Sequence, residues 1–125
     1  MIVAGIGCRA GCPAETLIAL IDTARAQAGV ARIDALASVT SKRDEPGLIE
    51  AARRLGHPLW LFDEAALDAV ATACPTRSEA VRRLVGIASV AEAAALAATA
   101  PCGTLILPRL TNGLATCALA RQEDP

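Results

Sequence analysis

The amino-acid sequence predicts an α/β fold for one domain, residues 1–125, in which a mixed, mostly parallel five-stranded sheet lies between two layers of helices. Short apolar runs alternate with longer segments whose apolar residues recur at helical spacing, and parallel strands need such helices as crossovers. Near the C-terminus, Asn112 and Gly113 instead predict a tight turn, which adds one antiparallel strand in a hairpin. The length of 125 residues suits a single domain.

The first half of the chain predicts three strands and two helices. The strands are three short apolar runs: Ile2–Ile6, Ala35–Val39 and Leu59–Phe62. The first helix opens at Pro13, carries apolar residues on one face and closes at Gly29. The second helix starts at Pro46, behind two acidic residues that suit its positive end, and stops at Gly56.

The second half of the chain predicts helices from capping signals and strands from two further apolar runs. Asp63 caps a helix that follows the third strand. Two pairs with capping-box spacing precede a short helix and an alanine-rich helix: Thr76 with Glu79, and Ser89 with Glu92. The last two strands are Thr104–Leu107 and Leu114–Ala120.

Composition and charge exclude several classes of protein. The 12 Lys and Arg residues face 13 Asp and Glu, and one Trp, one Phe and no Tyr leave little surface for stacking bases, so we expect no nucleic-acid partner. No apolar run is long enough to span a membrane and the N-terminus does not resemble a signal peptide, so we expect a cytoplasmic protein. The five cysteines form no CxxC pair and lie far in sequence from the single His57, so we expect reduced thiols, no metal and no cofactor.

Positively charged residues follow three of the predicted strands. Arg9 follows the first strand, in the stretch Gly7 to Gly11, Lys42 follows the second and Arg109 follows the fourth. Carboxyl ends of parallel strands meet at one edge of a sheet, so we expect the three cations around one concave surface. Helix N-termini follow the first two loops and also favour anions. The sequence therefore predicts a site for a ligand that bears carboxylates or phosphates.

A dinucleotide site is a minor alternative. Gly5, Gly7 and Gly11 give the spacing GxGxxxG, one residue longer than the usual fingerprint, and no acidic residue ends the second strand to bind a ribose. Lys42 and Arg43 could instead meet the 2′-phosphate of NADP. A Walker loop is excluded, because the only lysine is Lys42.

Candidates for catalysis have simpler structural explanations. Cys8 precedes a helix N-terminus, a setting that can lower a thiol pKa, but its base would have to be His57 at the exit of the second helix. We therefore expect loop packing, and not nucleophilic reactivity, to set the position of Cys8. Asp44 and Glu45 are candidates for a general acid or base, and both also suit the N-terminus of the second helix.

Several motifs occur in an order that resembles one protein family. They are GIGCRAG (5–11), KRDEPGL (42–48), SEAV (78–81), G-x-x-SVAEAAAL (86–96), Pro108-Arg109 and a T-x-A-x-A that begins at Thr116. Together they resemble the family of CobE and the C-terminal domain of CbiG, over nearly the whole chain. The resemblance implies a role in the corrin-forming part of cobalamin synthesis.

The resemblance also implies which residues bind the ligand. The motif matches, together with the cation of the Pro-Arg pair, are Gly7, Cys8, Arg9, Gly11, Lys42, Asp44, Glu45, Ser78, Glu79 and Arg109. One hypothesis is a carrier that binds a carboxylate-rich precorrin or corrin intermediate and exchanges it with other enzymes of the pathway. The other is a hydrolase that acts on the ring A lactone, as CbiG-type proteins do, with Asp44 or Glu45 as general base. Because this chain contains only the one domain, we expect binding rather than cleavage.

Overall fold

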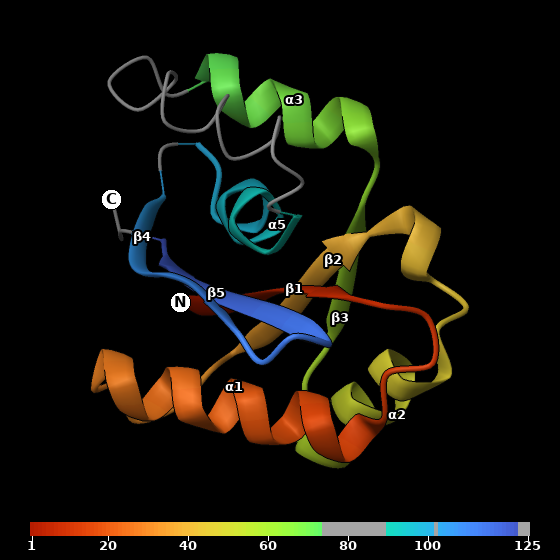
Figure 1. Ribbon diagram of the computed structural model, residues 1–125. Coiled ribbons are helices and arrows are strands. Elements are labelled where there is room, and N and C mark those ends of the chain that lie inside the picture. Colours follow the sequence, from red (N-terminus) through yellow and green to blue (C-terminus); the bar gives the residue numbers. More distant parts are fainter. Residues whose placement is uncertain (74–89, 102, 123–125) are drawn as a thin grey trace.

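One mixed five-stranded sheet forms the centre of the molecule (Figure 1), in a computed structural model that describes residues 1–73, 90–101 and 103–122. The strand order is β3-β2-β1-β5-β4. The strands are β1 (Ile2–Cys8), β2 (Ala35–Val39), β3 (Leu59–Phe62), β4 (Thr104–Thr111) and β5 (Ala115–Arg121). β1 pairs in parallel with β2, and β2 with β3, whereas β5 runs antiparallel to both of its neighbours, β1 and β4. The predicted mixed sheet with a C-terminal antiparallel hairpin is confirmed.

Helices cover both faces of this sheet, as the sequence predicts (Figure 1). One face is covered by α1 (Ala14–Ala28) and α2 (Pro46–Leu55), and the other by α5 (Val90–Ala98), against which α3 (Glu64–Ala73) packs. A short 3-10 turn, η1 (Thr40–Lys42), joins β2 to the loop before α2. Among the described residues, no helix is both long and apolar enough to cross a bilayer.

The core beneath α1 and α2 follows the predicted apolar pattern. Leu17 of α1, Leu36 of β2 and Leu119 of β5 are fully buried in it. Burying a leucine side chain stabilises a fold by about 1.5–3 kcal/mol, so contacts of this kind hold α1 to the sheet. Both helices end at glycines, Gly29 and Gly56, in the left-handed conformation, as predicted.

The core on the other face depends on small residues. Four alanines of α5 are buried: Ala91, Ala93, Ala94 and Ala95. A Cβ placed on Gly5 of β1 would overlap the carbonyl oxygen of Ala91, so the helix backbone lies directly on the strand. The alanine-rich sequence of α5 therefore allows an approach to the sheet that larger side chains would prevent.

Two strands are longer than predicted. β1 continues through Gly7 and Cys8, because β5 pairs with it as far as Cys8 opposite Ala115. β4 continues through Pro108 and Arg109 to Thr111, although proline usually ends a strand. Proline is tolerated there because β4 is an edge strand whose register against β5 shifts twice between Leu105 and Leu110.

One of the predicted helix caps, Asp63, lies within the described residues. The side chain of Asp63 accepts a hydrogen bond from the Ala66 amide at 2.8 Å, which confirms the predicted cap of α3. Thr76, Glu79 and Ser89, from the two predicted capping boxes, lie outside the described residues.

Candidate ligand-binding site

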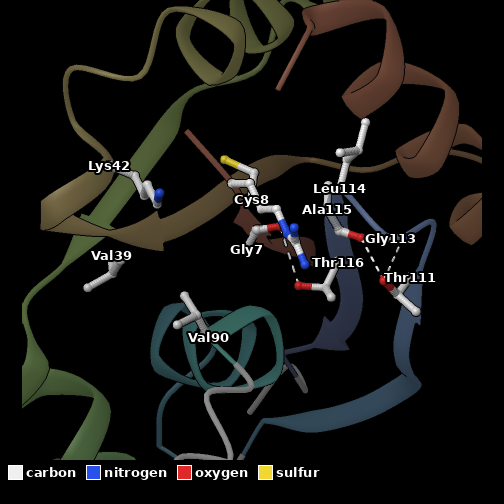
Figure 2. Close-up of a pocket in the computed structure, with 11 residues that line it drawn as sticks. Gly7, Cys8, Val39, Lys42, Val90, Thr111, Gly113, Leu114, Ala115 and Thr116 are labelled. Carbon is white, nitrogen blue, oxygen red and sulfur yellow. Dashed lines mark hydrogen bonds between the residues drawn. The ribbon is translucent and has the colours of Figure 1, made fainter. Parts of the chain in front are cut away.

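A cavity of about 310 Å³ lies at the carboxyl ends of β1 and β2 (Figure 2). Its lining comes from five places in the chain: Gly7, Cys8, Arg9, Val39, Lys42, Val90, Thr111 and residues 113–116. In the sheet, β2 lies on one side of β1 and β5 lies on the other. The chain therefore extends the sheet in one direction from β1 with β2, and later in the opposite direction with β5. Ligands of open α/β sheets bind at such a reversal.

A side-chain hydrogen bond joins the first two loops. The Glu45 carboxylate, just before α2, accepts a hydrogen bond at 2.6 Å from the amide of Gly11, whose φ is +80°. The first turn of α2 packs against the first loop, since a Cβ on Gly47 would overlap the carbonyl oxygen of Cys12. These contacts hold the loop of Arg9 and the loop of Lys42 in a fixed relation.

The cavity carries two cationic side chains without a counter-ion. Arg9 is exposed and Lys42 is half-buried. Within the described part of the chain, neither side chain has a carboxylate partner within ion-pair distance. By contrast, three arginines of α1 and α2 form ion pairs with carboxylates: Arg25, Arg53 and Arg54. Arg9 and Lys42 are therefore available to a ligand anion.

The remaining wall of the cavity is apolar with two hydroxyl groups. Val39, Val90 and Leu114 supply aliphatic side chains, and Figure 2 shows Val39, Lys42, Val90 and Thr116 arranged around Gly7. The hydroxyl of Thr116 donates a hydrogen bond to the Gly7 carbonyl at 3.4 Å. The site can thus hold a ligand that has both anionic groups and apolar surface.

Cys8 lines the cavity and also packs against the core. Its sulfur points away from Val90 in Figure 2, and the residue packs against the apolar cluster beneath α1. Burial raises the pKa of this thiol above its ordinary value; the charge of Lys42 opposes the rise, while Cys12 and Glu45 add to it. Cys8 is thus held at the end of β1 and not in a loop as expected, and its lack of nucleophilic reactivity stays a prediction.

The possible base for Cys8 lies elsewhere. His57 lines a smaller cavity with Ile33 and Arg32, next to the residues that enter β2. This cavity is at the amino ends of the strands, whereas Cys8 is at the carboxyl end of β1. A nucleophile and base formed by Cys8 and His57 is therefore excluded.

Some predicted site residues lie apart from the cavity. Arg109 is exposed within the edge strand β4 and does not line it, so the expected loop position after the fourth strand is wrong. Asp44 is exposed to solvent over 96% of its side chain, and neither Asp44 nor Glu45 is a lining residue. Ser78 and Glu79 lie outside the described residues.

The glycines of the GxGxxxG spacing do not form a single phosphate-binding turn. Gly5 and Gly7 lie within β1, and the space beside Gly5 is filled by the backbone of α5. Only Gly11 lies in the turn that precedes α1. Among the described residues, no group of three or more His, Cys, Asp or Glu is placed to hold a metal ion.

Sequence reasoning missed the hairpin contribution to the cavity. Thr111 and residues 113–116 line it because β5 pairs antiparallel with β1, which places the Asn112-Gly113 turn beside the first loop. A backbone hydrogen bond from Arg9 to the Leu114 carbonyl, at 3.0 Å, joins the two segments. The sequence predicts the turn itself, but it does not predict that the first loop lies beside the turn.

Comparison with known proteins gives a consistent result. Residues 2–120 match the protein family described as cobalamin synthesis G C-terminus. The chain is 38% identical over 121 residues to Protein CobE of Sinorhizobium sp, which covers 95% of this chain and 79% of that protein. Cobalamin biosynthesis protein chiG from Agrobacterium tumefaciens str. C58 has a similar crystal structure, with a TM-score of 0.82, 39% identity and coverage of 99% and 100% of the two chains. The crystal structure of CobE, a protein from the cobalamin (vitamin B12) biosynthetic pathway, gives a TM-score of 0.80 and 38% identity over 97% and 93%.

Proposed function

Because the chain belongs to the cobalamin synthesis G C-terminus family and has a role in cobalamin biosynthesis, we propose that its cavity binds a carboxylate-rich precorrin or corrin intermediate. The protein acts in this proposal as an accessory or carrier protein. The observation that carries it is that Arg9 and Lys42, two cations without a carboxylate partner among the described residues, lie on two hydrogen-bonded loops at one partly apolar cavity. Corrin intermediates combine the same two properties, since acetate and propionate groups surround a largely apolar ring.

The size of the cavity supports binding of part of the ring. A volume of about 310 Å³ is at the lower end for ligand pockets and is smaller than a tetrapyrrole macrocycle. One edge of the macrocycle, with its carboxylates, therefore enters the cavity while the rest stays accessible. An intermediate held in this way remains accessible to the next enzyme of the pathway, as a carrier requires.

Hydrolysis with Asp44 or Glu45 as general base has less support. A general base must reach the proton that it removes, directly or through one water molecule. The Glu45 carboxylate is instead bonded to the Gly11 amide, and the Asp44 side chain is in solvent. Neither position offers a free carboxylate inside the cavity.

A calorimetric titration of the purified protein with dicyanocobyrinic acid, a corrin that carries free carboxylates, tests the proposal. A hydrogen bond between charged groups contributes about 1.5–3 kcal/mol, so Arg9→Ala or Lys42→Ala should weaken binding by roughly 10- to 100-fold. Arg9→Ala should leave the thermal midpoint almost unchanged, because Arg9 is exposed. Affinity of the wild type should fall as salt rises, more steeply than that of Arg9→Ala.

Arg43→Ala is the matched control. Arg43 follows Lys42 directly and is exposed over 74% of its side chain, but it does not line the cavity. Its removal changes the net charge by the same amount, so it reports the general electrostatic effect alone. Equal affinities of wild type, Arg9→Ala and Lys42→Ala at low salt, or no binding by the wild type, would overturn the proposal.

A further inference from the structure

The tip of the β4–β5 hairpin, residues 111–115, presents an exposed apolar side chain at the rim of the cavity. Leu114 is 46% exposed and is one of the lining residues. Single exposed leucines are common on proteins, so exposure alone says little. Ile49 of α2 is exposed to the same degree, 47%, and does not line the cavity. Leu114 also differs from Ile49 in the side-chain hydrogen bonds that hold the backbone around it.

Side-chain hydrogen bonds hold the hairpin tip in one conformation. The Asn112 side-chain oxygen accepts hydrogen bonds from the amides of Leu114, at 3.0 Å, and Ala115, at 2.9 Å. The Thr111 hydroxyl accepts a bond from the Gly113 amide and donates one to the Ala115 carbonyl, both at 3.1 Å (Figure 2). A surface that is already ordered loses little conformational entropy when a ligand binds.

The hairpin tip is also fixed relative to the cation loop. The Arg9 amide donates its hydrogen bond to the carbonyl of Leu114 itself, at 3.0 Å. The preceding residue, Cys8, is opposite Ala115 in the antiparallel ladder of β1 and β5. The apolar side chain of Leu114 and the guanidinium of Arg9 therefore extend from two residues whose backbones are hydrogen-bonded to each other.

We propose that Leu114 is a specificity-determining residue, which packs against the apolar surface of the ring while Arg9 and Lys42 pair with its carboxylates. This inference rests on the proposed function and adds a second requirement to it. The site then selects ligands in which an apolar ring edge lies beside anionic side chains, and it discriminates against small polycarboxylates that carry no apolar surface. Leu114 contributes through removal of its exposed side chain from water when the ligand is bound.

Two probes separate the apolar contribution from the ionic one. Dicyanocobyrinic acid carries free carboxylates, whereas dicyanocobinamide has the same ring with amides in their place, and cyanide fills both axial positions of the cobalt in each. Leu114→Ala removes three carbon atoms from a contact that buries about half of the side chain, so its affinity should fall roughly tenfold for both probes. Arg9→Ala should weaken binding of the acid far more than that of the amide. Ile49→Ala is the matched control and should change neither affinity.

The outcomes distinguish this inference from the proposed function. If wild type binds the acid and Leu114→Ala binds both probes as tightly as wild type does, Leu114 has no such role, although the anion site remains. If wild type binds neither probe, both proposals fail. If Leu114→Ala does not fold, Leu114→Gln keeps the length of the side chain but makes it polar, and it should show the same loss for both probes. Equal affinity of a folded Leu114→Gln variant would also overturn the inference.

Discussion

Glu45 shows how a single carboxylate can join two loops of a candidate site. Its side chain lies half-buried between the first two loops and accepts the hydrogen bond of the Gly11 amide. A hydrogen bond to an ionised acceptor is stronger than a neutral one, so this contact fixes the first loop against the start of α2. We therefore assign Glu45 a positioning role, whereas the sequence alone left it as a candidate general base.

Two substitutions at Glu45 separate these roles. Glu45→Gln keeps an oxygen that can accept the Gly11 hydrogen bond, so it should retain affinity for dicyanocobyrinic acid within about threefold of wild type. Glu45→Ala removes the acceptor and should weaken binding by roughly tenfold. Any pathway output of the protein should follow the same order. If Glu45 acts as a general base, Glu45→Gln should instead abolish that output while binding of the acid persists.

At the scale of elements, the contact between α5 and β1 determines how close the second helical layer lies to the sheet. Small residues on both partners allow it: buried alanines on the helix, and Gly5 on the strand. Val90, the first residue of α5, lines the cavity, so the position of this helix also shapes the site. The packing of α5 and the shape of the cavity therefore depend on the same contact.

Gly5→Ala tests this contact through the sign of its effect. Replacing a glycine by alanine inside a strand usually stabilises a protein, because glycine loses more conformational freedom on folding. Here the added methyl group would overlap the α5 backbone, so we expect a loss of about 1–3 kcal/mol and a lower midpoint of thermal unfolding. The double variant Gly5→Ala/Ala91→Gly should stay destabilised, since the overlap involves a carbonyl oxygen and not a side chain. A Gly5→Ala protein as stable as wild type would contradict this account.

At the scale of the whole molecule, the strand order places β1 at the centre, between β2 and β5, and β3 and β4 at the edges. The centre joins the two ends of the chain, because the parallel half from the N-terminus meets the hairpin from the C-terminus along β1 and β5. The cavity lies at the carboxyl end of this junction. A site that needs both halves forms only when the complete sheet is assembled.

Native-state hydrogen exchange can test this arrangement. Amides of β1 and β5 have neighbours on both sides and should exchange only through global unfolding. Amides of β4 should exchange at least roughly tenfold faster, because this edge strand has two register shifts against β5 and can open locally. Equal protection of β4 and β1 would show that the hairpin and the parallel half open as one unit.

Local signals in the sequence were enough to predict most helices, strands and turns. Alternating apolar runs and helical periodicity predict the elements, glycines predict the ends of α1 and α2, and Asn112-Gly113 predicts the hairpin turn. The rule that ligands bind at the carboxyl ends of parallel strands then places Arg9 and Lys42 at one cavity. Each of these signals acts over a few residues, or follows from the general topology of α/β folds.

Contacts between distant segments could be identified only in the folded protein. The pairing of Cys8 with Ala115 extends β1, brings the hairpin tip to the cavity and supplies Leu114, yet no local propensity encodes a contact between residues so far apart in the chain. The same limit explains why Arg109 lies in a strand and not in the predicted loop. Pro108 would be expected to end the strand, but proline is tolerated in an edge strand. Only the assembled sheet defines β4 as an edge strand. Long-range pairing is set by burial of the whole core, and this burial is a property of the folded chain rather than of any segment of its sequence.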